Sequence, residues 1–218
     1  MDRPGLSRDR VIEAAAAVAD RSGLVGVTMR SVGAELGVEA MSLYHHVRGK
    51  DDLVDGLADW VFALIAVPRP GGEWRSEMVL RAESARAALS AHPWGLGMIE
   101  SRRAAGDALL RHHDAVLGCL REGGFPVALA AHAFSAIDSY TYGFVLTEVN
   151  LPFEPGESAD EFVTGLSLPA QRYPYLAEMI AEQVEGRDYA YADEFTYGLD
   201  LILDALAARL TGSGIGEK

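Results

Sequence analysis

Two glycines divide the first fifty residues into short helical segments, and this division limits what the chain can fold into. Gly23 and Gly37 each stand at the end of a helical pattern, where a left-handed backbone is needed. The second pattern covers residues 29–36, and a third covers residues 40–47 and ends at Gly49. Three short helices joined by tight turns predict a compact trihelical unit.

Capping residues and apolar spacing support this unit. Ser7 suits the N-cap of the first helix and Thr28 that of the second, because a side-chain oxygen can accept a hydrogen bond from a first-turn N–H group. Residues four positions apart share one helical face. The expected core consists of Val11, Ala15, Val18, Leu24, Val32, Leu36, Leu43 and Val47.

The rest of the chain also predicts helices, which makes the fold class all-α. A fourth helix opens at Asp51 and Asp52, whose charge suits a helix N-terminus, and prolines stop it after residue 67. Further helices are expected over residues 74–91, 94–101, 105–122, 126–149, 169–183 and 189–210. A long loop over 150–168 and a flexible tail over 212–218 are expected, and no alternating run indicates a strand.

Length and composition suit a small domain joined to a larger one. The proline-rich and glycine-rich segment after residue 67 is the expected boundary, which gives a domain over 1–50, a connecting helix over 51–67 and a larger domain over 68–218. No apolar run approaches the roughly 20 residues of a membrane span. Cys119 is the one cysteine of the chain, so no internal disulfide can form and the cytoplasm is the expected compartment.

The order of residues in the trihelical segment is specific. The residues that carry this pattern include Leu36-Gly37-Val38, Leu43-Tyr44-His45-His46-Val47 and Lys50. Residues 14–57 resemble the DNA-binding domain of TetR-family transcriptional regulators. Segments that resemble the tetracycline-repressor-type C-terminal domain follow at 122–125, 140–146 and 195–203. The resemblance implies a homodimer with two DNA-binding heads, whose bodies hold a small-molecule effector that moves the heads apart.

The resemblance also implies roles for residues of the head. Tyr44 and Lys50 are expected at phosphates and His45 in the major groove, with His46 packed inward, while Arg30 can reach a base or a phosphate. The predicted contacts with double-stranded operator DNA are Thr28, Arg30, Ala40, Met41, Ser42, Tyr44, His45 and Lys50.

The start of the third helix departs from the family's usual polar pattern. Ala40 and Met41 can touch thymine methyl groups but cannot make bidentate hydrogen bonds. Arg30 and Ser42 therefore carry much of the expected base recognition, and DNA shape supplies the rest. The alternative left open is a helical, dimeric ligand sensor that does not itself bind DNA.

The net charge of −13 is unevenly distributed. Residues 1–50 hold seven Arg and Lys against six Asp and Glu, a balance of +1, so residues 51–218 hold 12 against 26, or −14. An acidic body repels DNA, while a near-neutral head leaves a few cations for phosphates. We therefore expect modest nonspecific affinity for DNA.

Two apolar stripes predict the dimer interface, which pairs the helices over 126–149 and 189–210 with their mates as a four-helix bundle. The stripes consist of Phe134, Ile137, Thr141, Phe144 and Val145, and of Phe195, Leu199, Ile202, Leu203, Leu206 and Leu210. The alternative is that both stripes fill the core of a single chain.

Aromatic residues mixed with a few polar groups indicate the effector pocket. The predicted set is Trp94, Met98, His113, Phe134, Asp138, Tyr142 and Asn150. Thr147 stands where the magnesium–drug site of the tetracycline repressors would have a Glu, and no His lies near Glu100. We therefore expect no metal and no other cofactor, and an aromatic or amphipathic metabolite as effector.

No residue pattern indicates catalysis. His112 and His113 are consecutive, so they point apart, and the chain has no His-Glu-x-x-His motif. Cys119 shares an apolar helical face with Val116 and Leu120, which predicts a buried, unreactive thiol. The protein is therefore not expected to be an enzyme or to bind a membrane.

Overall fold

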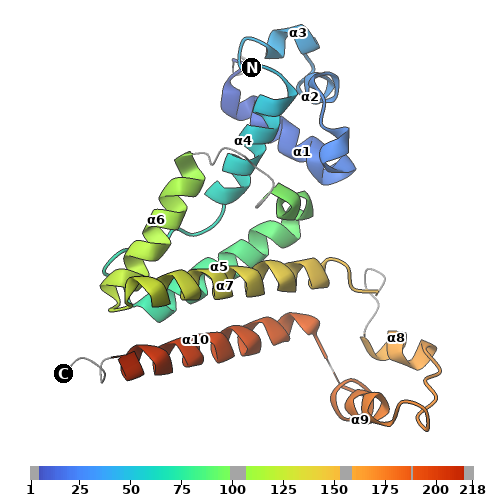
Figure 1. The fold of residues 1–218 in the computed structure, drawn as a ribbon. Coiled ribbons are helices and arrows are strands. Elements are labelled where there is room, and N and C mark those ends of the chain that lie inside the picture. The colour runs from blue at the N-terminus through green and yellow to red at the C-terminus, as the bar shows by residue number, and fades with distance from the viewer. Residues whose placement is uncertain (1–4, 99–106, 153–158, 188, 214–218) are drawn as a thin grey trace.

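The computed structural model describes residues 5–98, 107–152, 159–187 and 189–213, and its regular elements are all helices (Figure 1). The head comprises α1 (Arg8–Gly26), α2 (Met29–Leu36), α3 (Ala40–Leu43) and α4 (Lys50–Ala63). The body comprises α5 (Trp74–Ala91), the 3₁₀ turn η1 (Pro93–Met98), α6 (Asp107–Glu122), α7 (Val127–Glu148), α8 (Ala159–Gly165), α9 (Pro174–Gln183), the 3₁₀ turn η2 (Tyr191–Asp193) and α10 (Glu194–Ser213). The predicted all-α architecture of a small head on a larger body is confirmed.

Local capping sets the helices of the head, as the sequence predicts. Ser7 Oγ accepts from the Arg10 N–H at 3.3 Å. Thr28 Oγ1 accepts from the Ser31 N–H at 3.0 Å while Ser31 Oγ accepts from the Thr28 N–H at 2.9 Å, which forms a reciprocal capping box. Gly37 ends α2 with φ of 66°, a left-handed conformation that glycine adopts without steric cost.

The core of the head is apolar and consists largely of the predicted residues. Six of the eight are buried and the other two, Leu24 and Leu36, are partly buried against the same cluster. Leu53 and Leu57 of α4 join this cluster, and so does Met98 from η1 of the body. The head therefore packs as one unit that includes a residue from the body.

Two helices of the head are shorter than the sequence predicts. The third was expected to reach Val47, but α3 ends at Leu43, because the Leu43 carbonyl accepts from both the His46 and Val47 N–H groups in a tight turn. The fourth was expected to reach residue 67, but it ends at Ala63, where i→i−3 hydrogen bonds tighten its last turn.

The body also differs from the prediction in places. The expected loop over 150–168 contains the short helix α8, and α10 continues through Ser213 into the segment expected to be a flexible tail. The helix expected over 94–101 is the 3₁₀ turn η1 as far as Met98, and its remainder lies outside the described residues. None of the described helices is long and apolar enough to span a membrane.

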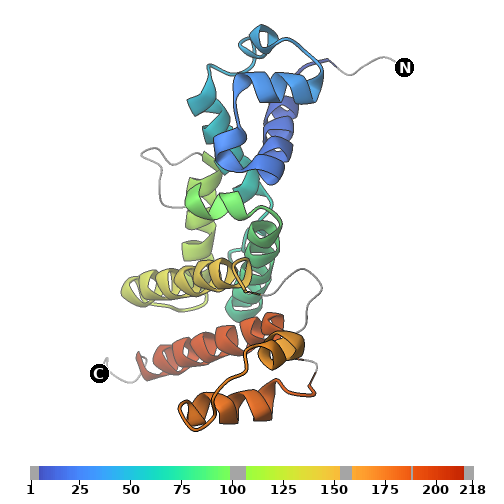
Figure 2. The same cartoon turned by 90° about the vertical axis from the view of Figure 1, so that its right-hand side faces the viewer.

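Helix α7 is the centre of the body and packs against α5, α6 and α10 (Figure 2). The two stripes predicted as the dimer interface lie largely in this contact: Ile137, Phe195 and Leu203, for example, are fully buried within the chain's own core. The prediction that these stripes face a second subunit was therefore wrong. The spacing identified apolar faces correctly, but α7 and α10 cover each other.

Candidate nucleic-acid interface and effector site

The predicted DNA contacts form an exposed surface of the head. Tyr44 is 49% exposed and Met41 is 73% exposed, while Arg30, His45 and Lys50 are exposed as well. Ala40 and Ser42 are half-buried, and the exposed Thr28 uses its hydroxyl to cap α2. Large apolar and cationic side chains project into solvent from α2, α3 and the turn that follows α3. This surface can therefore bind a polyanion.

Asp52 fixes the turn that carries Tyr44 and His45. Its carboxylate accepts from the Arg48 backbone N–H at 2.9 Å and from both terminal nitrogens of Arg8 at 3.0 and 2.7 Å. The hydrogen bond from Arg8 and the one from Arg48 lower the pKa of Asp52. The start of α1 and the start of α4 are thus tied to the same turn.

A polar hollow of about 500 Å³ lies at this turn. It is lined by Arg8, Tyr44, His45, His46, Val47, Arg48 and Asp52. The sequence analysis named neither Arg8 nor Arg48 among the site residues. Arg8 comes near Tyr44 only because it contacts Asp52, which lies 44 positions further along the chain. A cation in the first turn of the first helix, facing an acid in the first turn of the fourth, was the available signal.

The predicted effector residues do not form one group. Met98 is buried in the core of the head, and Trp94 donates from its indole Nε1–H to Asp20 of α1 at 2.6 Å. Asn150 is exposed and donates to the Leu146 carbonyl at 2.7 Å. Trp94 and Met98 thus belong to the junction of head and body, and Asn150 lies at the end of α7.

The other four predicted residues meet around Arg81 of α5, which is 1% exposed. Arg81 Nη1 lies 2.6 Å from Asp138 Oδ1, and the Tyr142 hydroxyl donates to Asp138 Oδ2 at 3.2 Å. The guanidinium carbon lies 5.7 Å from the centre of the Phe134 ring, whose edge-to-face contact with His113 has a centroid separation of 4.9 Å. Burial and the neighbouring Asp138 raise the pKa of Tyr142, so its hydroxyl stays protonated.

His112, which the sequence did not single out as a site residue, completes this group. It is 2% exposed and its Nε2 accepts from Arg81 Nε at 2.8 Å. Burial and then the charge of Arg81 lower the pKa of His112 to about 4, so its ring is neutral at pH 7. Its Nδ1 has no hydrogen-bond partner among the described residues. Sequence spacing does not reveal that an arginine of α5 reaches α6, and for this reason His112 was not identified from the sequence.

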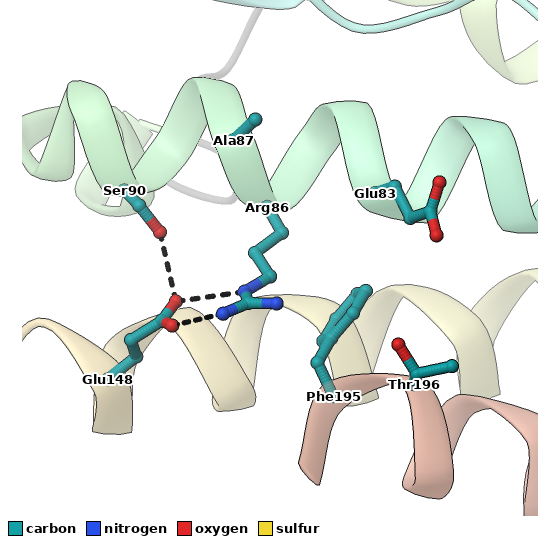
Figure 3. Close-up of a pocket in the computed structure, with 7 residues that line it drawn as sticks. All are labelled: Glu83, Arg86, Ala87, Ser90, Glu148, Phe195 and Thr196. Atoms are coloured by element: carbon teal, nitrogen blue, oxygen red, sulfur yellow. Dashed lines mark hydrogen bonds and ion pairs between the residues drawn. The ribbon is translucent and has the colours of Figure 1, made fainter. Parts of the chain in front are cut away.

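A second polar group joins α5, α7 and α10 beside a hollow of about 300 Å³ (Figure 3). Arg86 pairs with Glu148, which also accepts from the Ser90 hydroxyl at 3.1 Å. The Arg86 guanidinium carbon lies 5.1 Å from the Phe144 ring centre and 5.0 Å from that of Phe195. Because these polar groups satisfy one another, we interpret the arrangement as a structural link between the three helices.

The described residues contain no group of three or more His, Cys, Asp or Glu side chains that could hold a metal ion. Thr147, at the position where a Glu would be expected, donates to the Gly143 carbonyl at 3.1 Å. The stretch near Glu100 lies outside the described residues. Cys119 is buried as predicted, and burial raises the pKa of its thiol.

Two family models match this chain. Residues 11–57 match bacterial regulatory proteins of the tetR family, and residues 67–210 match the tetracyclin repressor-like C-terminal domain. The HTH-type transcriptional repressor DrrR1 of Streptomyces coeruleorubidus is 33% identical over 94% of this chain and 78% of its own length. The class A tetracycline repressor protein from transposon 1721 of Escherichia coli is 32% identical over 94% of this chain and 92% of its own length.

Solved structures show the same architecture over nearly the whole chain. The apo structure of ActR from Streptomyces coelicolor has a TM-score of 0.75 at 25% identity and covers 97% of this chain and 100% of its own. ActR in complex with actinorhodin has a TM-score of 0.73 at 27% identity, covering 98% and 100%. With an exposed helix-turn-helix head and matches to both domains, the chain belongs to the TetR family of ligand-responsive, DNA-binding transcriptional regulators.

Proposed function

We propose that this regulator is a repressor that binds operator DNA as a homodimer in the cytoplasm and leaves it when a small molecule enters the body. The observation that carries this proposal is the exposed surface of the head around Tyr44, held rigid from below by an apolar core. The names of two relatives support it: DrrR1 is called a repressor, and ActR has been solved with actinorhodin.

On DNA, Tyr44 and Lys50 contact phosphates and His45 enters the major groove, with Arg30 and Ser42 at base edges or phosphates. Thr28 caps the helix that carries Arg30, and Ala40 and Met41 offer apolar contacts to thymine methyl groups. The domain boundaries proposed for these roles are 1–50 for the DNA-binding domain, 51–67 for the connecting segment, in which α4 ends at Ala63, and 68–218 for the larger domain.

The test is a gel shift with a duplex from the region upstream of the protein's own gene. Because both side chains are exposed, Tyr44→Ala and Lys50→Ala leave the core intact and should each weaken binding, with Lys50→Ala also lowering the salt dependence by about one phosphate contact. Arg187→Ala, which removes an exposed cation after α9, is the control and should bind like the wild type. Equal binding by all variants would contradict the proposed interface.

We propose that the dimer forms through the outward faces of α7 and α10. Tyr197 and Leu201 are 67% and 56% exposed on α10, one turn apart, and Leu146 is 56% exposed on α7. Such residues cover little area singly, but a mate with the same two helices would bury all of them in one self-complementary contact. Leu201→Glu should produce a monomer in sedimentation, whereas Leu110→Glu on α6, at a similarly exposed position, should not.

We place the effector in the body, against the residues gathered around Arg81. His113, Phe134, Asp138 and Tyr142 combine aromatic surfaces with a few hydrogen-bonding groups, which is the composition of a small-molecule site. A Phe134→Ala variant that still binds the upstream duplex but no longer responds to the effector would support this placement. A response equal to that of the wild type would count against it.

A further inference from the structure

The buried group around Arg81 is more polar than the fold of the body requires. Arg81 and His112 are almost fully buried, and Arg81 pairs with Asp138 although a buried ion pair is often replaceable by apolar side chains without loss of stability. The apolar cluster that includes Met78, Leu120 and Ile137 already joins the same three helices. The polar group therefore needs a reason other than holding α5, α6 and α7 together.

One hydrogen-bond donor of this group has no acceptor among the described residues. An arginine can only donate, so Arg81 Nε supplies the proton of its bond to His112 Nε2, and that nitrogen is an acceptor. A neutral imidazole with an unprotonated Nε2 carries its proton on Nδ1. This Nδ1–H is buried and has no partner among the described residues, whereas Asp138 Oδ1 is satisfied by its ion pair with Arg81. Leaving a buried donor unsatisfied costs free energy.

We propose that His112 Nδ1–H is the fixed hydrogen-bond donor of the effector site, and that the effector presents to it the carbonyl or phenolic oxygen of an uncharged, planar ring system. This inference rests on the proposed effector-binding role of the body and specifies the chemistry of that ligand. The bond from Arg81 to Nε2 polarises the ring and strengthens the donor on its other side.

The surroundings of His112 select for this class of ligand. The charges of Arg81 and Asp138 cancel, so the site has no net charge to attract a carboxylate or a phosphate. The Phe62 ring centre lies 6.3 Å from that of His112, and Phe134 and His113 add aromatic surfaces that a flat ring can stack on or meet edge-on. Neither nitrogen of His112 is free to bind a metal, because one is protonated and the other is engaged by Arg81.

The test uses a pair of probes that differ in one functional group. 9-Fluorenone and fluorene have the same flat tricyclic shape, but only the ketone carries an acceptor oxygen. Both are titrated into the full-length protein by calorimetry, with EDTA present, and the measured quantity is the ratio of their dissociation constants. Because the ratio is taken within each variant, general damage to the body affects both probes and cancels.

The wild type should bind the ketone about tenfold more tightly than the hydrocarbon, the factor expected for one added hydrogen bond in a buried site. His112→Leu, which has no donor, should bring the ratio close to one, and His112→Gln, which keeps both an acceptor for Arg81 and a donor, should retain part of it. His132→Gln, at an exposed position of α7, is the matched control and should keep the full ratio.

Three results would overturn the proposal: no binding of either probe to the wild type, equal binding of both, or a ratio that persists in His112→Leu. The last would mean that the ketone is recognised elsewhere and that a buried water satisfies Nδ1–H. The titrations contain no DNA, so a protein that fails to bind its upstream duplex would contradict the repressor function and leave the ketone ratio as an independent result.

Discussion

The head and the body of this regulator differ in where their polar groups lie. The head carries them on its surface, whereas the body buries several of them in its interior. In the head, the fully buried side chains, such as Val32, Leu43 and Leu53, are apolar, and the hydrogen-bonding residues face solvent. The buried polar or charged residues identified in the described chain all lie in the body: Glu77, Arg81, His112 and Thr141.

This contrast agrees with what each region is proposed to recognise. A duplex is too large to enter a domain, so the head needs a rigid interior and a polar exterior that matches grooves and phosphates. A small effector enters the protein, so its polar partners must be buried and held in place by one another. The stability of the two regions should therefore respond differently to substitution and to pH.

The largest effect should come from breaking the buried ion pair of the body. Asp138→Leu leaves the Arg81 charge buried without its partner and should lower the free energy of unfolding by about 4 kcal/mol in urea denaturation. Replacing both residues with Leu removes the stranded charge and should recover most of that loss. If the double variant is as unstable as the single one, the ion pair is not the source of the instability.

Truncating the apolar core of the head should cost slightly less. Leu43 is fully buried, so Leu43→Ala removes apolar contacts and leaves a cavity, at a cost of about 3 kcal/mol. Duplex binding should be lost while fluorenone binding to the body is unchanged. Leu110→Ala, at an exposed position of α6, should change the stability by less than about 0.5 kcal/mol.

The pH dependence should separate the two regions further. Because burial lowers the pKa of His112 to about 4 from an unfolded value of about 6.5, the unfolded chain binds one proton more between these values. Stability should therefore fall as pH drops through this window, by up to about 1.4 kcal/mol per pH unit. Urea denaturation of His112→Gln should show a flatter profile from pH 6.5 to 4; an unchanged profile would show that His112 is not the titrating group.

The sequence predicted the head better than the body because the signals of the head are local. The box between Thr28 and Ser31 spans three positions, and the turn at Gly37 needs only a residue that tolerates positive φ. The contact of Arg8 with Asp52 joins residues 44 positions apart, and that of Arg81 with His112 joins residues 31 apart. No short-range pattern encodes such pairs, so the sequence identified four residues around Arg81 but neither Arg81 nor His112.

The stripe on α10 shows a second limit of sequence analysis. Periodicity correctly placed Phe195, Leu199 and Leu203 on one face, but it does not say whether that face meets another helix of the same chain or a second subunit. Only the packing against α7 shows that this face meets a helix of the same chain. That packing leaves the side chains of Tyr197 and Leu201 exposed. The sequence thus identified the apolar faces of α7 and α10, but these faces pack within the chain and do not face a second subunit.

The smallest effect should come from the junction where the two regions meet. Asp20 of α1 accepts from Trp94 Nε1 at 2.6 Å and is hydrogen-bonded to His92 Nδ1 at 2.7 Å, and the His92 ring also packs edge-on against Trp60, with centroids 4.8 Å apart. His92→Phe keeps the ring contact and the Trp94 bond and removes one hydrogen bond, so it should cost about 1 kcal/mol. Hydrogen exchange should rise at the end of α1 and in η1 while the centre of α7 stays protected. A loss as large as that of Leu43→Ala would mean that the contact between Asp20 and His92 supports the core of the head as strongly as Leu43 does, and the two regions could then no longer be treated as separately stabilised.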